Sequence, residues 1–117
     1  MEQQTLTRGG IYLAKLDPAK QDEVGKIRPI IILNSQTILN ASPPIIFICP
    51  LSSQSKPEFS TLHIELEIRD NLQVKSYALV EHCRSITINR IIYPRLAQTT
   101  FSELNNILHK LQRLIGL

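Results

Sequence analysis

The chain has little of what marks several common protein classes. Its 117 residues include two cysteines, no tryptophan, and only three tyrosines and three phenylalanines. Cys49 and Cys83 both lie in apolar segments, which favours buried thiols over a disulfide or a metal-binding pair. There is no CxxC or HExxH spacing and the histidines are scattered, so the sequence predicts neither a metal site nor a cofactor.

Long apolar runs are also missing. No stretch approaches the roughly 18 apolar residues of a membrane span, and the first ten residues contain no signal-peptide core. We therefore expect a cytoplasmic protein without a membrane partner, and a single domain over residues 1–117. The formal net charge of +3 and the pI near 9.1 are compatible with an anionic partner but do not establish one.

The segment 25–34 carries the most informative pattern. Ile30 to Leu33 form an apolar run without alternation, rich in β-branched residues, which is typical of a strand buried on both faces. Pro29 fixes its own φ and favours an extended Arg28, so the strand is predicted to begin here. The Arg28 guanidinium would then lie at the end of a rigid strand, where its fork of donors can meet a phosphate. A surface ion pair of Arg28 is the alternative interpretation.

The remaining pattern predicts a mainly β fold. Strands are expected over 9–16, 28–34, 44–50, 61–68, 77–82 and 84–88, with a short one near 94–97. The segment 34–40 can form a short helix, and 52–60 is predicted to be an exposed loop.

The C-terminal segment is predicted to be a helix. Apolar residues repeat there at three and four positions, namely Phe101, Leu104, Ile107, Leu108, Leu111, Leu114 and Ile115. Thr100 and Glu103 have the spacing of a capping box, and Gly116 follows the last periodic residue. His109 falls on the outer face, where solvation is favoured over catalysis. Several short strands followed by a terminal helix favour a small barrel.

Five short motifs occur in a fixed order along the chain. They are Arg-Gly-x-Ile-Tyr at 8–12, an acidic loop followed by Gly-x-x-Arg-Pro at 25–29, an apolar strand ending in Asn34, Pro-Leu-Ser-Ser at 50–53, and the segment 76–86. This series resembles the MazF/PemK family of toxin endoribonucleases over almost the whole chain. The resemblance implies an α+β, mainly β fold of the CcdB/PemK type: a small SH3-like β-barrel with short helices and a C-terminal helix, assembled as a homodimer.

The same resemblance implies a function. The expected protein is a sequence-specific, metal-independent endoribonuclease that cleaves single-stranded RNA (mRNA) and is the toxin of a toxin–antitoxin module. RNA can be cut without a metal because its 2′-OH is an internal nucleophile, and the products would be a 2′,3′-cyclic phosphate and a 5′-OH. A cognate antitoxin is expected to be acidic and partly disordered.

Two other interpretations remain open at this point. The same barrel occurs in CcdB-like toxins, which bind and poison DNA gyrase without cutting nucleic acid. A degenerate domain that has lost activity is the third. If RNA is bound, the scarcity of aromatic residues favours hydrogen bonds to splayed bases over a broad stacking platform.

The motifs assign roles to particular residues. Arg28 matches the catalytic arginine of the family, and it would stabilise charge on the phosphate because a protonated arginine is not an ordinary general base. Ser52 occupies a position that is usually threonine, and its hydroxyl can donate to a phosphate oxygen; Ser53 is the alternative, one residue along. Glu23 matches an acidic position that could accept the 2′ proton or bind a base edge. Lys26 is expected to contact backbone phosphate.

The segment 76–86 and the first motif contain departures from the family. His82 stands where glutamine is usual, and it could hydrogen-bond a base, stack on one or carry a proton. Glu81 could pair with Arg28 or Arg84 and hold the arginine ready. Arg84 itself is expected to bind phosphate or form an ion pair. Gly10 replaces a common aspartate, which bears on the loop geometry more than on the chemistry.

Overall fold

The structure, a computed structural model, describes residues 5–16 and 27–117. Its strands are β1 (Gly10–Lys15), β2 (Ile27–Ile32), β3 (Ile45–Ser52), β4 (His63–Leu66), β5 (Ser76–Leu79), β6 (Arg84–Thr87) and β7 (Ile91–Gln98). The α-helices are α1 (Gln36–Asn40) and α2 (Phe101–Leu114), and the 3-10 helices are η1 (Pro57–Leu62), η2 (Val80–His82) and η3 (Ile88–Arg90).

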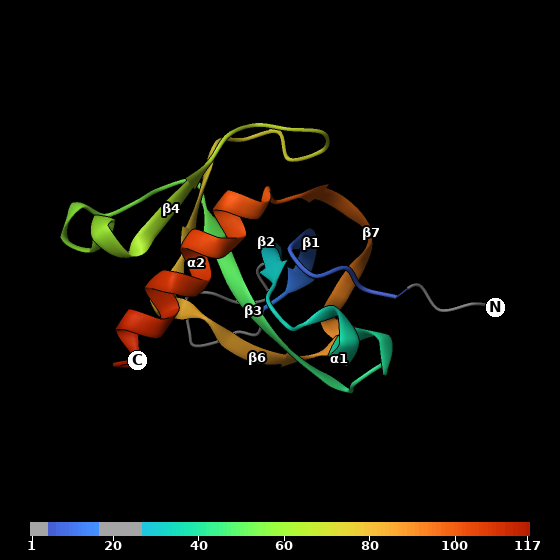
Figure 1. The fold of residues 1–117 in the computed structure, drawn as a ribbon. Helices are drawn as coiled ribbons and strands as arrows, with labels where there is room; N and C mark the ends of the chain where they lie inside the picture. The colour runs from blue at the N-terminus through green and yellow to red at the C-terminus, as the bar shows by residue number, and fades with distance from the viewer. Residues whose placement is uncertain (1–4, 17–26) are drawn as a thin grey trace.

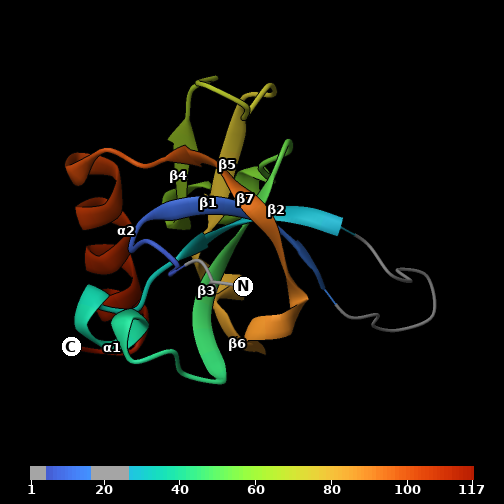
Figure 2. The ribbon, with the colours of Figure 1, turned by 90° about the vertical axis from the view of Figure 1, so that its right-hand side faces the viewer.

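The seven strands form one antiparallel, strongly curled sheet (Figures 1 and 2). The strand order is β4-β5-β3-β2-β1-β7, and β6 pairs with β3 beside this path. The long strand β3 therefore has two partners on one edge: its first half pairs with β6 and its last two residues, Leu51 and Ser52, pair with β5. Among the described residues no ladder joins β4 to β7, so the barrel-like sheet is open.

The predicted mainly β fold with a C-terminal helix is confirmed, with local corrections. The strand expected over 77–82 ends at Leu79, because the chain turns into η2 and the Cys83 N–H donates to the Val80 carbonyl at 3.2 Å. The last strand is longer than expected, spanning Ile91–Gln98. The segment expected to be an exposed loop contains η1, which begins at a proline.

The strand β2 lies between β1 and β3 and is buried on both faces, as predicted. Ile31, which pairs with Ile11 of β1 and Cys49 of β3, faces a core cluster that also includes Ile107 of α2. Ile30 and Ile32 face the opposite cluster, around Leu39, Ile46 and Ile86. The strand thus separates two apolar clusters and contributes side chains to both.

Helix α2 packs against β4 and η2 and is anchored at its first turn. The predicted capping box is present, and Arg69 holds the Glu103 carboxylate with two hydrogen bonds of 2.5 and 2.7 Å. Burial raises the pKa of Glu103, but the hydrogen bonds from Arg69 and Thr100 outweigh it and lower that pKa overall. The ends of the apolar stripe are exposed, with Phe101 at 82% and Ile115 at 63%.

The turn before β1 explains the glycine found in place of aspartate. Gly9 has a positive φ of 77°, and its N–H donates to the Ile32 carbonyl at 2.8 Å. A Cβ at Gly10 would lie 2.8 Å from the Tyr12 ring and 2.9 Å from the Thr7 carbonyl oxygen. The space that an aspartate side chain would need is therefore taken by Tyr12, and the turn keeps its backbone hydrogen bonds without that side chain.

Two isoleucines of β3 provide a test of the core. Ile48 is fully buried whereas Ile45, in the same strand, is 54% exposed. We expect Ile48→Ala to lower the free energy of unfolding by roughly 2–5 kcal/mol, because lost transfer energy and a cavity add together. Ile45→Ala should cost under about 1 kcal/mol. Urea denaturation followed by circular dichroism measures both, and equal costs would contradict the assignment of the core.

Candidate active site

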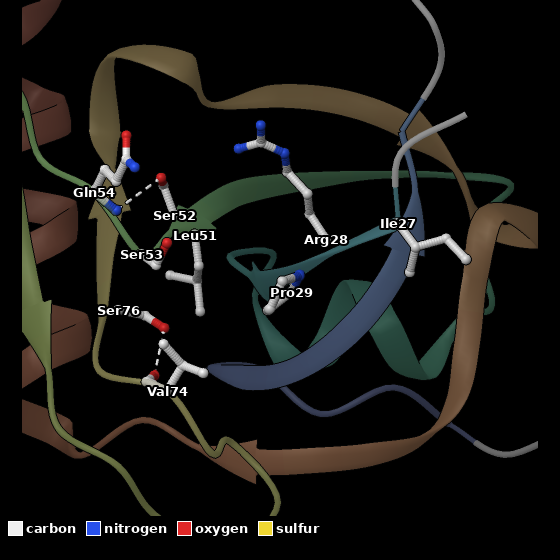
Figure 3. A pocket seen from close by; sticks show the side chains of 9 residues that line it. All are labelled: Ile27, Arg28, Pro29, Leu51, Ser52, Ser53, Gln54, Val74 and Ser76. Carbon is white, nitrogen blue, oxygen red and sulfur yellow. Dashed lines mark hydrogen bonds between the residues drawn. The ribbon is translucent and has the colours of Figure 1, made fainter. Parts of the chain in front are cut away.

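An open pocket of about 590 Å³ lies where β2 begins and β3 ends (Figure 3). Its walls come from three segments of the sheet: the start of β2, the end of β3 with the loop after it, and the segment entering β5. The lining residues are Ile27, Arg28, Pro29, Leu51, Ser52, Ser53, Gln54, Val74 and Ser76. Of these described residues only Arg28 is charged and none is aromatic, so the pocket is suited to an anionic group held by polar contacts.

Register explains why Arg28 and Ser52 share this pocket. The β2–β3 ladder pairs Ile32 with Ile48, Ile31 with Cys49 and Ile30 with Pro50. Continued by two residues, this register brings Arg28 opposite Ser52, and opposite residues of antiparallel strands face the same side. The ladder itself stops at the Ile30–Pro50 pair, and the pocket lies beyond that end, between the start of β2 and the end of β3.

Arg28 is the second residue of β2 and pairs with Ala14 of β1. Its side chain is half-buried, and its guanidinium points toward the side of the pocket where Ser52 and Gln54 lie (Figure 3). The predicted strand start at Arg28-Pro29 is confirmed to within one residue, since β2 begins at Ile27. A guanidinium in this position is held by a core strand and open to a ligand.

Ser52 is the last residue of β3 and pairs with Tyr77 of β5. Its Oγ accepts a hydrogen bond of 3.1 Å from the Gln54 backbone N–H. Because the oxygen is already an acceptor in this turn, the hydroxyl proton is free to be donated into the pocket. Ser53 also lines the pocket but is exposed.

The lining residues that were not predicted as site residues include Ser76, Gln54 and Val74. The Ser76 hydroxyl donates to the Val74 carbonyl at 2.8 Å, which leaves its oxygen as an acceptor at the pocket wall. Ser76 opens the fifth sequence motif, so that motif was a signal for it. Gln54 and Val74 lie in loops, and nothing in the sequence pattern marks them as pocket residues.

Glu81 has a different partner from the one expected. It pairs neither with Arg28 nor with Arg84; its carboxylate lies 2.8 Å from Nε2 of His63, whose other ring nitrogen lies 2.6 Å from the Ser55 hydroxyl. The His63 side chain is only 4% exposed. The expected pairing was wrong because η2 turns Glu81 toward β4, which carries His63, rather than along the sheet toward the arginines.

The other predicted site residues lie away from this pocket or outside the described residues. His82 has a side chain that is 63% exposed, with Nε2 3.8 Å from Glu81. Arg84 is exposed on β6, opposite Ile48. Neither residue lines the pocket, and Glu81 does not line it either. Glu23 and Lys26 fall in 17–26, outside the described residues.

Within 5–16 and 27–117, no group of three or more histidine, cysteine, aspartate or glutamate side chains is placed to hold a metal ion. In the same part of the chain no helix combines the length and apolarity that crossing a membrane requires.

Comparison with known proteins decides the family. Residues 7–115 match the family described as PemK-like, MazF-like toxin of type II toxin–antitoxin system. The chain belongs to this family. The MazF/PemK membership predicted from the five motifs is thereby confirmed.

Individual MazF proteins agree with this membership. The endoribonuclease MazF of Staphylococcus saprophyticus is 32% identical over 104 residues, which cover 86% of each chain. The crystal structure of MazF from Deinococcus radiodurans superposes with a TM-score of 0.80 at 23% identity, covering 98% of this chain and 100% of that one. Mycobacterium tuberculosis toxin MazF-mt6 gives a TM-score of 0.74 at 14% identity, over 92% and 97% of the two chains. The last two similarities concern the fold alone.

The two histidines beside Glu81 provide a matched test of which one stabilises the fold of this MazF-like chain. We expect His63→Ala to lower the free energy of unfolding by roughly 1–3 kcal/mol, because the Glu81 carboxylate loses its buried partner. His82→Ala, which removes an exposed histidine near the same carboxylate, should change it by less than about 0.5 kcal/mol. Urea denaturation at neutral pH measures both, and a larger loss for His82→Ala would contradict the assignment.

Proposed function

We propose that this chain cleaves single-stranded RNA at specific sequences, without a metal, by attack of a ribose 2′-OH on the adjacent phosphodiester. The observation that carries the proposal is the placement of Arg28 and Ser52 on facing strands around one open pocket. One supplies a fixed positive charge and the other a hydroxyl proton. Those are the two kinds of donor that a phosphate passing through a pentacoordinate state requires.

Family membership gives the general function: the chain is an endoribonuclease toxin of a type II toxin–antitoxin system. The relatives reported above are MazF endoribonucleases and MazF toxins. They do not favour the gyrase-binding alternative of the CcdB type. The proposal therefore concerns the chemistry and the residues that perform it.

Arg28 is proposed to stabilise negative charge in the transition state. Its planar fork can hold two phosphate oxygens at once, and a strand buried on both faces limits its movement before substrate arrives. As the 2′ oxygen attacks phosphorus, charge builds up on the non-bridging oxygens and then on the departing 5′ oxygen. A guanidinium already in place stabilises that charge with little reorganisation.

Ser52 is proposed to donate its hydroxyl proton to a non-bridging phosphate oxygen. The Gln54 N–H fixes the Ser52 oxygen from the loop side, so the proton is directed elsewhere. The Ser76 oxygen, with its own proton used on Val74, offers an acceptor for a ribose hydroxyl or a base amino group. These polar groups suit a ribonucleotide better than a uniformly apolar ligand.

The remaining roles are proposals that rest on the family resemblance. Glu23 is the proposed acceptor of the 2′ proton, with recognition of a base edge as its other role. Lys26, Ser53, His82 and Arg84 are proposed to contact RNA that flanks the cleaved bond. Glu81 is proposed to contribute to the RNA-binding surface indirectly, by holding His63 in position.

Partners and location are proposed on similar grounds. A crystal structure of MazE-MazF from Deinococcus radiodurans is known, and so is a structure of a mycobacterial endoribonuclease in complex with its cognate antitoxin. We propose that a cognate acidic antitoxin likewise binds this chain, whose formal net charge is +3. A cytoplasmic homodimer of the single 1–117 domain is proposed as the working form.

Substitutions at Arg28 and Ser52 test the catalytic proposal. Arg28→Ala should reduce the cleavage rate of a long RNA in EDTA by roughly a hundred- to a thousandfold or more, because a charged donor to the transition state is lost. Arg28→Lys should recover only part of this rate, since a lysine lacks the planar fork. Single-turnover cleavage measures each rate, and cleavage by Arg28→Ala at the parent rate would exclude the mechanism.

The neighbouring serines serve as each other's control. Ser52→Ala should slow cleavage severalfold to a hundredfold, whereas Ser52→Thr should restore it because the donor is kept. Ser53→Ala, which removes only a proposed contact to flanking RNA, should keep close to the parent single-turnover rate when the enzyme saturates the RNA. If Ser53→Ala is the slow variant and Ser52→Ala is not, the hydroxyl role belongs to Ser53.

The nucleophile can be tested on the RNA itself. An oligonucleotide with one 2′-deoxyribose on the 5′ side of the cleaved bond should not be cut there, because the attacking oxygen is missing. The unmodified RNA should give a 2′,3′-cyclic phosphate and a 5′-OH, detected by mass spectrometry of the fragments. Cutting at the deoxy position would show that another nucleophile, such as water, attacks the phosphorus.

A further inference from the structure

The two cysteines of the chain are neighbours across the sheet. Both are free thiols, and both pack in the core cluster on the side of β2 that faces α2. The β3–β6 ladder pairs Ile48 with Arg84, so Cys49, the next residue of β3, and Cys83, the residue just before β6, meet where that ladder ends. Opposite Cβ atoms in an antiparallel pair lie about 4.5–5.5 Å apart, and a disulfide spans about 3.5–4.5 Å, so the bond forms when the two segments approach by up to about 1 Å.

The environments of the two thiols differ. Cys49 is fully buried in β3, while Cys83, which follows η2, is partly exposed. A hydrogen bond with Cys49 lowers the pKa of Cys83, although burial and the nearby Glu81 carboxylate oppose this effect. The same hydrogen bond, together with burial, raises the pKa of Cys49 well above its ordinary value. One thiol is therefore the more nucleophilic and accessible, and the other remains protonated beside it.

We propose that Cys49 and Cys83 form a reversible oxidation site, in which a hydroperoxide oxidises Cys83 and Cys49 then closes an intrachain disulfide between β3 and the start of β6. The order of the two thiols follows from their exposure, since a peroxide can reach Cys83 before it reaches Cys49. Cys49 acts as the resolving thiol that prevents further oxidation of Cys83.

The proposed steps balance in atoms and electrons. The Cys83 thiolate attacks the hydroperoxide, so an S–O bond forms, the O–O bond breaks, and hydroxide or an alkoxide leaves and takes up a proton. The Cys49 sulfur then attacks the Cys83 sulfenic acid; the S–S bond forms, the S–O bond breaks, and the hydroxide leaves with the Cys49 proton as water. The two thiols lose two electrons in total, and the hydroperoxide gains them.

This site is separate from the RNA-cleavage proposal, and it stands or falls independently of that activity. The test uses the reduced full chain treated with hydrogen peroxide and then with an alkylating agent. We expect the intact mass to fall by that of two hydrogens, a cross-linked peptide joining Cys49 to Cys83, and reversal by dithiothreitol. The oxidised protein should also have a higher Tm than the reduced protein, because the cross-link restrains the unfolded chain.

Single substitutions separate the two roles. In Cys49→Ala, Cys83 should be trapped as a dimedone-labelled sulfenic acid and should proceed to sulfinic acid with more peroxide. In Cys83→Ala, Cys49 should remain an unmodified thiol at the peroxide dose that cross-links the parent. Should either variant fail to fold by circular dichroism, the parent's cross-linked peptide decides the question alone. Sulfinic acid at Cys83 of the parent without a cross-link, or a lower Tm after oxidation, would overturn the proposal.

Discussion

The burial of β2 on both faces is the constraint on which the rest of the structure depends. Ile30, Ile31 and Ile32 are fully enclosed between β1 and β3 and divide between two core clusters. A slip by one residue could carry Pro29, which has no backbone N–H, into the position between β1 and β3 that Ile30 holds, so the proline limits where the enclosed part of the strand begins. Arg28 lies two residues before Ile30, and its position is therefore set by packing rather than by loop conformation. A guanidinium positioned in this way can be preorganised for a phosphate.

The second requirement for the pocket is that the ladder between β2 and β3 ends at Pro50. Beyond this point Leu51 and Ser52 keep a partner on the opposite edge of β3, where they pair with β5. If β2 and β3 had stayed paired, Arg28 and Ser52 would lie side by side on a continuous sheet. Because the strands part there, the two side chains face a common space instead (Figure 3). The loops that edge this space, with Gln54 and Val74, are where sequence recognition of a substrate can vary without disturbing the core.

Much of this arrangement could be predicted from the sequence, because short-range patterns determine it. The β-branched run after Pro29 predicted the buried strand, and Thr100 with Glu103 predicted the start of α2. The pairing of Glu81 with His63 could not be predicted, because the residues are 18 positions apart and meet only after η2 has turned the chain. The same reason applies to pocket residues in loops. Sequence motifs indicated which residues matter, and only the folded sheet showed which of them meet.

On the edge away from β2, β3 passes from β6 to β5, and two chemically active places lie close together along this stretch. Within four residues, the strand passes from Cys49, at the end of its ladder with β6, to Ser52, at its pairing with β5. The residues between them, Pro50 and Leu51, are buried and leave the backbone little freedom. The thiol pair lies at the edge of this stretch that faces β6, and the pocket lies at the edge that faces β2, where the ladder stops at Pro50. The thiol pair and the pocket therefore flank the same four residues of β3 on its two opposite edges.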